Sequence, residues 1–81
     1  MQSLQWTDDT GSDHPPVDEH GDEYAEYESA ETDGYLFTAS RRQGDNYVKL
    51  RIITDQKDVY GSACINMTQA KGRAARFLRD H

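Results

Sequence analysis

The sequence lacks the features of a disulfide-rich, secreted or membrane-spanning chain. Its 81 residues include one cysteine, Cys64, so no internal disulfide can form. No run approaches the roughly 18 apolar residues that a bilayer-spanning helix requires. The N-terminus has neither the basic nor the apolar segment of a secretory signal. We therefore expect a cytoplasmic protein with at most one small domain.

Catalytic and metal-binding motifs are missing as well. The sequence contains no phosphate-binding glycine-rich loop, no nucleophile elbow and no zinc signature. His14 and His20 lie among acidic residues, but their spacing matches no regular metal-ligand pattern. Cys64 has no histidine near it in the sequence, so we expect a packed side chain rather than a nucleophile. The prediction is a protein that is not an enzyme and that uses no cofactor and no metal.

Charge divides the chain near Gly34. Residues 1–33 contain eleven acidic residues and no lysine or arginine, whereas residues 34–81 contain nine basic and four acidic residues. The two parts carry −11 and +5, which gives the formal net charge of −6. Few residues of the first part could fill a core, and ordering each residue costs roughly 1–2 kcal/mol of backbone entropy. The composition predicts a disordered acidic tail over 1–33 and a folded domain over 34–81.

Three aromatic residues of this tail are candidates for docking. Trp6, with Leu4 beside it, is either the anchor of a short docking motif or part of a segment that adds an edge strand or covers part of the domain core, and we slightly favour the covering role. Tyr24 and Tyr27 are three residues apart in a helix-tolerant stretch, so they would share one face of a helix that forms on a basic partner. The alternative is a solvated tail that only keeps the protein soluble.

Alternation of apolar and polar residues in the second part predicts an antiparallel sheet. A period of two recurs in three segments, which are residues 35–42, 47–54 and 59–65. Turn-forming residues separate the segments, so the strands should follow one another as a meander. In the third segment we expect Val59, Gly61, Ala63 and Ile65 to face the core.

The last segment changes to the period of a helix. Its apolar stripe comprises Met67, Ala70, Ala74, Phe77 and Leu78. Either Thr68 or Asn66 can cap this helix, the latter with Gln69 as its capping-box partner. The expected fold is α+β, a three-stranded antiparallel β-meander packed against one C-terminal helix (β-β-β-α), preceded by the disordered acidic tail. So small a domain is near the limit of independent stability, which favours a homodimer or an obligate partner.

The sheet face away from the helix is the predicted binding surface. It should carry interleaved basic and tyrosine side chains, which are Arg42, Tyr47, Lys49, Arg51 and Tyr60. Cations and rings of this kind suit nucleic acid, but they suit docking of a protein too, or they only solvate an exposed face. The net charge of −6 argues against simple nucleic-acid binding. A tail that folds back on the basic face would regulate access to it; alternatively, the tail itself would mimic a nucleic acid and block a basic groove on another protein.

A resemblance to known proteins lies in the C-terminal helix. The chain resembles small uncharacterised bacterial and phage-encoded proteins. In those proteins a helix opens with the pattern Leu-Thr-x-x-Gln-Ala-x-x-x-Ala-x-x-Leu. The matching stretch begins Met67-Thr68-Gln69-Ala70, so two residues of the pattern are missing between Thr68 and Gln69. The resemblance implies an accessory protein that binds and modulates a host factor, and it implies no activity. We expect a small regulatory protein that binds a protein partner; the alternative is a nucleic-acid-binding domain gated by its acidic tail.

Overall fold

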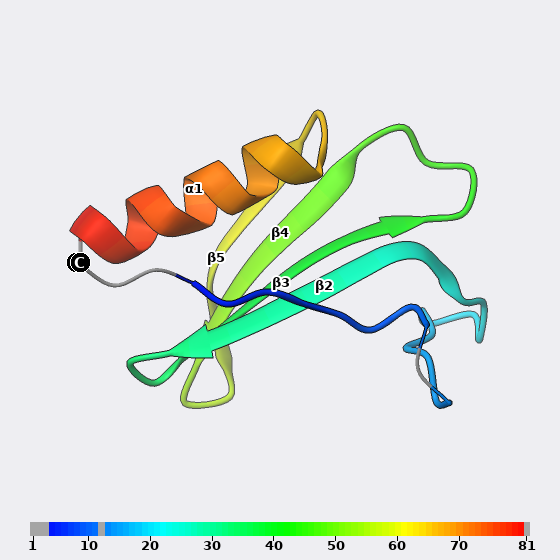
Figure 1. Ribbon diagram of the computed structural model, residues 1–81, viewed down its shortest axis with the longest axis horizontal. Helices are drawn as coiled ribbons and strands as arrows, with labels where there is room; N and C mark the ends of the chain where they lie inside the picture. Colours follow the sequence, from blue (N-terminus) through cyan, green and yellow to red (C-terminus); the bar gives the residue numbers. More distant parts are fainter. Residues whose placement is uncertain (1–3, 12, 81) are drawn as a thin grey trace.

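The structure is a computed structural model that describes residues 4–11 and 13–80. It contains one antiparallel sheet and one C-terminal helix, α1 (Met67–Asp80) (Figure 1). The strands are β1 (Thr7–Asp8), β2 (Tyr24–Thr32), β3 (Tyr35–Arg42), β4 (Val48–Thr54) and β5 (Lys57–Cys64). They lie in the sheet in chain order, and every neighbouring pair is antiparallel. No helix in the described part of the chain is long and apolar enough to cross a membrane.

The sheet has five strands rather than the predicted three, because the acidic segment before Gly34 contains two of them. β2 pairs with β3 from one end to the other, and Asp33 and Gly34 form the two-residue turn between them. Both turn residues have positive φ, 53° and 80°, as a type I′ hairpin turn requires. Backbone pairing with β3 thus orders a strand that contains few apolar side chains. The predicted three-stranded meander with a disordered acidic tail is wrong.

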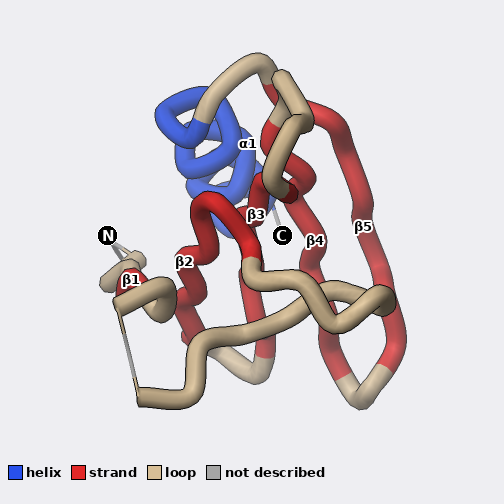
Figure 2. The backbone as a smooth tube through the Cα atoms, turned by 90° about the vertical axis from the view of Figure 1, so that its right-hand side faces the viewer, coloured by secondary structure: helices blue, strands red, loops and turns tan. Residues whose placement is uncertain are grey.

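Helix α1 packs on β3, β4 and β5 and covers one face of the sheet, here called the helix face (Figure 2). The opposite side of the sheet is called the outer face. The most deeply buried side chains lie between helix and sheet and are Phe37, Ala39, Val48, Leu50, Ile52, Cys64, Ala70 and Ala74. Burial of each large apolar side chain contributes about 1.5–3 kcal/mol. Phe37 and the β4 residues therefore carry most of the hydrophobic stabilisation.

A one-residue bulge in β5 reverses the side-chain directions expected for that strand. Thr54 pairs with Lys57 across a two-residue turn, and an unbroken ladder from there would place Val59 opposite Ile52. The register shifts by one residue instead, so Ile52 pairs with Tyr60. Side chains of a strand alternate between its two faces. This single insertion therefore turns Tyr60, Ser62 and Cys64 to the helix face, and Gly61 and Ala63 to the outer face.

The residues of β5 and its end that were expected in the core are consequently outside it. They are Val59, Gly61, Ala63 and Ile65, and all four are exposed. Val59 and Ile65 retain 46% and 74% of their accessible surface, whereas Cys64 retains 2%. The prediction that these four residues face the core is therefore wrong. Cys64 is the β5 residue that completes the core.

Helix α1 begins with a cap at Asn66. The Asn66 side-chain oxygen accepts a hydrogen bond from the Gln69 N–H at 2.8 Å, and the Gln69 side-chain oxygen accepts one from the Ile65 N–H at 2.8 Å. Asn66 is one of the two predicted caps, and Gln69 reaches one residue further back than it does in a capping box. These two bonds fix the angle at which the chain turns from β5 into α1.

The segment before β1 closes the margin of the core on the helix face. Leu4 and Trp6 pack against the buried cluster, and the Lys71 ammonium lies 5.7 Å from the centroid of the Trp6 ring. Lys71 also forms an ion pair with Glu28 of β2, 2.7 Å from Nζ to Oε1. Trp6 thus lies where the covering role predicts, and the acidic strand is tied to the helix beside it.

The membership of β2 in the sheet can be tested with a buried charge. Ala30 of β2 is 5% exposed within the core, so Ala30→Asp should lower the free energy of unfolding by about 2–4 kcal/mol. Ala25→Asp makes the same change at a half-buried position of β2 and should cost about 1 kcal/mol or less. Urea unfolding followed by circular dichroism measures both. Equal effects of the two substitutions would show that β2 is not packed in the sheet.

Candidate functional site

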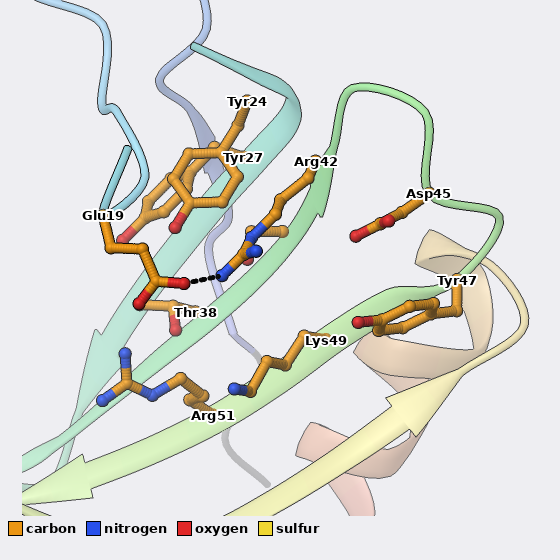
Figure 3. A pocket seen from close by; sticks show the side chains of 10 residues that line it. Glu19, Tyr24, Tyr27, Thr38, Arg42, Asp45, Tyr47, Lys49 and Arg51 are labelled. Carbon is orange, nitrogen blue, oxygen red and sulfur yellow. Dashed lines mark hydrogen bonds and ion pairs between the residues drawn. The ribbon is translucent and has the colours of Figure 1, made fainter. Parts of the chain in front are cut away.

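The outer face carries a depression of about 340 Å³ lined mainly by polar side chains (Figure 3). Its cations are Arg42, Lys49 and Arg51, and its aromatic rings are those of Tyr24, Tyr27 and Tyr47. The hydroxyl and carboxylate groups belong to Thr38, Ser40, Glu19 and Asp45. Alternate residues of β3 and β4 supply its floor, because those side chains point away from the helix.

Four of the five residues predicted for the outer face line this depression, and they are Arg42, Tyr47, Lys49 and Arg51. The fifth, Tyr60, lies on the helix face, where its ring centroid is 5.8 Å from that of Phe77. The expected position of Tyr60 on the outer face is therefore wrong. The physical reason is the β5 bulge, which exchanges the directions of the side chains that follow it.

Tyr24 and Tyr27 lie in the same depression because β2 contains a bulge of its own. Residues three apart in a regular strand point to opposite faces. The register between β2 and β3 shifts between Tyr24 and Glu26, which makes Ala25 the extra residue. The two tyrosines consequently share the outer face, with ring centroids 5.2 Å apart. They were expected on one face of a helix, and they share one face of a strand instead.

Glu19 is a residue of this depression that sequence analysis did not identify. It comes from the loop before β2, and its Oε1 accepts a hydrogen bond from Arg42 Nη2 at 3.0 Å. The hydrogen bond to the Glu19 carboxylate is the main cause that raises the pKa of Arg42, although both side chains remain accessible to water. The only sequence signal for this contact was the opposite charge of the two parts of the chain.

A tight turn places Glu19 over the sheet. The Asp18 carboxylate accepts hydrogen bonds from the backbone N–H groups of His20 and Asp22, and the Gly21 N–H donates to the Asp18 carbonyl. Desolvation opposes ionisation of Asp18, but the two backbone hydrogen bonds outweigh it and lower the pKa of this carboxyl. Gly21 has a φ of 84°, a conformation that suits glycine.

The other two cations of the depression differ in what they contact. Arg51 Nη2 lies 2.9 and 2.8 Å from the two carboxylate oxygens of Asp58 on the neighbouring strand. Lys49 is exposed, and within residues 4–11 and 13–80 no hydrogen bond or ion pair engages its ammonium group. Lys49 is therefore the cation in this depression that is most available to a ligand.

The three docking residues predicted for the acidic segment do not form one site. Tyr24 and Tyr27 line the depression on the outer face, whereas Trp6 packs on the helix face beside Lys71. The described residues contain no cluster of three or more His, Cys, Asp or Glu side chains that could hold a metal ion. Cations, hydroxyls and phenol rings around one depression suit non-covalent binding of an anionic group.

Comparison with known proteins gives no match: no protein-family model, no curated protein and no solved structure matches this chain.

The environment of Tyr27 predicts a late-ionising phenol. Partial burial raises the pKa of Tyr27, repulsion by Tyr24 and Asp9 adds to the rise, and Arg51 opposes it. The folded state therefore holds the proton more tightly than the unfolded state, and this stability is lost as the pH rises above 10. In a titration of tyrosinate absorbance, Tyr27→Phe should remove the last phase, and Tyr47→Phe should leave that phase in place. A last phase that survives in Tyr27→Phe would contradict this assignment.

Proposed function

We propose that this chain is a small, non-enzymatic protein-binding module, and that the depression on its outer face receives an acidic segment of a partner protein. The observation that carries the proposal is the ion pair between Glu19 and Arg42, 3.0 Å long. It supports the depression as a place for carboxylates because a carboxylate of the chain already occupies one of its cations. By covering an acidic segment of its partner, such a module would modulate what that partner can bind.

The chemistry around Arg42 supports a carboxylate ligand. A guanidinium presents several N–H donors in a fixed plane, and Arg42 uses one nitrogen for Glu19. Lys49 provides a second cation on the adjacent strand, where it lies opposite Ser40, and the hydroxyls of Ser40 and of Thr38, which lies opposite Arg51, line the same depression. Hydrogen bonds of this kind to a charged group are worth about 1.5–3 kcal/mol each when they are made in a site of fixed geometry. The tyrosine rings supply apolar area for the rest of a bound segment.

The charge distribution favours an acidic protein segment over a nucleic acid. Two carboxylates, Glu19 and Asp45, line the same depression as the three cations, and Arg51 is already paired with Asp58. A phosphate backbone would require an uninterrupted row of positive charge, and the chain as a whole carries −6. A segment with carboxylates at a few positions needs only local neutralisation.

Single-stranded nucleic acid is the second candidate ligand. The observation that favours it is the presence of three tyrosines beside cations on an open sheet face, since bases can stack on such rings. In this alternative the Glu19 loop would gate access of the nucleic acid to Arg42.

Charge reversal at Lys49 tests the depression directly. Lys49→Glu should weaken binding of a fluorescein-labelled hexaglutamate peptide by about tenfold, since one charge-assisted contact is replaced by repulsion. Lys57→Glu makes the same change outside the depression, at the start of β5, and should weaken binding much less. Fluorescence anisotropy at low ionic strength measures both affinities.

Two results of that experiment would contradict the proposal. Equal loss of affinity in the two variants would mean that the peptide responds only to net charge. Tighter binding of a labelled single-stranded hexanucleotide than of the peptide, with the same dependence on Lys49, would select the nucleic-acid alternative.

Removal of the internal competitor should strengthen binding. Glu19→Gln leaves Arg42 without its charged partner, so affinity for the hexaglutamate peptide should rise by roughly threefold to tenfold. Glu31→Gln removes the same charge from an exposed position of β2 outside the depression and serves as the control. If both substitutions raise the affinity equally, then Glu19 does not compete for Arg42.

A further inference from the structure

Three cations of the depression occupy neighbouring positions on β3 and β4. Lys49 of β4 lies opposite Ser40 of β3. Arg42 comes two residues after Ser40, and Arg51 comes two residues after Lys49, so each shares a face with its neighbour. Residues opposite each other in an antiparallel pair are about 5 Å apart, and alternate residues of one strand are about 6.6 Å apart. Long side chains at this spacing can bring their charged ends to one place.

The charged ends of these side chains converge around Thr38. Figure 3 shows Arg42, Lys49 and Arg51 turned toward the same part of the depression. The Glu19 carboxylate lies in that part, and Thr38 lies between the cations (Figure 3). The three cations therefore surround a space that has a small hydroxyl side chain at its base and a carboxylate on one side.

Arg51 takes part in this cluster by reaching across the sheet. It belongs to β4, yet its charge opposes the rise in the pKa of Tyr27 on β2. Its guanidinium therefore extends over β3, which lies between those two strands. Asp58 contacts Arg51 through Nη2, so the guanidinium can offer its other nitrogens to a ligand.

Glu19 determines how much charge a ligand must bring. A ligand of Arg42 displaces the Glu19 carboxylate, so a carboxylate in that place exchanges one ion pair for a similar one. The cost of displacing Glu19 is the same for every ligand. A ligand therefore gains affinity from the depression mainly through the contacts that it adds with Lys49 and Arg51.

We propose that the acidic segment received by this depression carries a phosphorylated serine, a proposal that rests on the function proposed for the same site. A phosphate monoester has a charge of about −1.5 to −2 at pH 7 and three strong acceptor oxygens. A carboxylate has one charge and two oxygens. The phosphate can replace Glu19 at Arg42 and still present oxygens to Lys49 and Arg51, as arginine clusters do when they bind phosphorylated motifs.

The size and the charge of the depression favour phosphoserine in a protein segment. Serine is a short carrier of the phosphate, so the segment stays close enough to the sheet for its other side chains to contact the rings of Tyr24, Tyr27 and Tyr47. One phosphate needs only the cluster of cations around Thr38. A nucleic acid needs a longer row of positive charge, which Glu19 and Asp45 interrupt.

Fluorescein-labelled peptides that differ at one position test the proposal. They have the sequence Glu-Glu-X-Glu-Glu, where X is phosphoserine, glutamate or serine. The phosphoserine peptide should bind at least about tenfold more tightly than the glutamate peptide, because its additional charge and oxygen engage a further cation. The serine peptide should bind most weakly. Fluorescence anisotropy measures the three affinities.

Removal of one cation should reduce the preference for phosphate. Lys49→Gln should lower the ratio of the two affinities, phosphoserine over glutamate, to about threefold or less, since the dianion loses more than the carboxylate does. Lys57→Gln removes the same charge at the start of β5, outside the depression, and should leave the ratio unchanged. Circular dichroism confirms that each variant is folded.

The outcomes separate this proposal from the proposed function. Equal affinity for the phosphoserine and glutamate peptides, with both weakened by Lys49→Gln and not by Lys57→Gln, overturns phosphoserine and leaves the acidic segment in place. If no peptide binds, or if both variants weaken binding equally, the proposed function is overturned and phosphoserine with it.

Three further results would assign the phosphate to another source. The first is tighter binding of a peptide with phosphotyrosine at the central position. The second is inorganic phosphate that displaces the phosphoserine peptide at a concentration close to the Kd of the peptide. The third is a labelled single-stranded hexanucleotide that binds more tightly than the phosphoserine peptide. Each of these results overturns phosphoserine as the recognised group.

Discussion

The backbone pairing of β2 with β3 is the interaction on which the rest of the structure depends. It brings the acidic half of the chain into the sheet through the turn at Asp33 and Gly34. It also carries Tyr24 and Tyr27 to the outer face and brings Glu19 within 3.0 Å of Arg42. Without this pairing the basic residues of β3 and β4 would face water with no acidic segment beside them. The composition of the depression therefore follows from a hairpin.

Two single-residue bulges decide which side chains belong to which face. Ala25 is the extra residue in β2, and it lets two tyrosines three positions apart point the same way. Val59 is the extra residue in β5, and it sends Tyr60 to the helix face while it remains exposed itself. Side chains alternate with a period of two, so one inserted residue moves every later side chain of its strand to the other face. The outer face and the β5 edge are both set by these insertions.

The sequence predicted the elements whose pattern is local and missed those that depend on register. β3, β4 and α1 follow from alternation and helical spacing, and the apolar stripe of β4 is buried as expected. β2 was missed because it lies in the acidic part of the chain and three of its nine residues are glutamates, although Asp33-Gly34 is a strong hairpin signal. The direction of β5 was missed because each of its two alternating sets contains residues that can pack in a core, and only the bulge selects the set that contains Cys64. Four residues of the depression, Arg42, Tyr47, Lys49 and Arg51, were predicted from the alternation of side chains along the strands. Glu19 was not predicted, because a contact made by a loop leaves no periodic pattern in the sequence.

The opposite charges of the two halves contribute little to the stability of the fold and mainly affect which cations can bind a ligand. Ion pairs between described residues join the acidic half to the basic half, and they include those of Glu19 with Arg42, Glu26 with Arg41, and Glu28 with Lys71. Exposed pairs of this kind stabilise a fold by about 1 kcal/mol or less, so they cannot replace the hydrophobic core as the source of stability. Their larger effect is on what remains available for binding, because each pair engages one cation that a ligand would otherwise find unpaired. Any ligand of Arg42 must displace Glu19, whereas a ligand of Lys49 displaces no ion-pair partner among the described residues. The two cations should therefore differ in how binding responds to the chain's own acidic loop, and this difference distinguishes a gated site from an open basic patch.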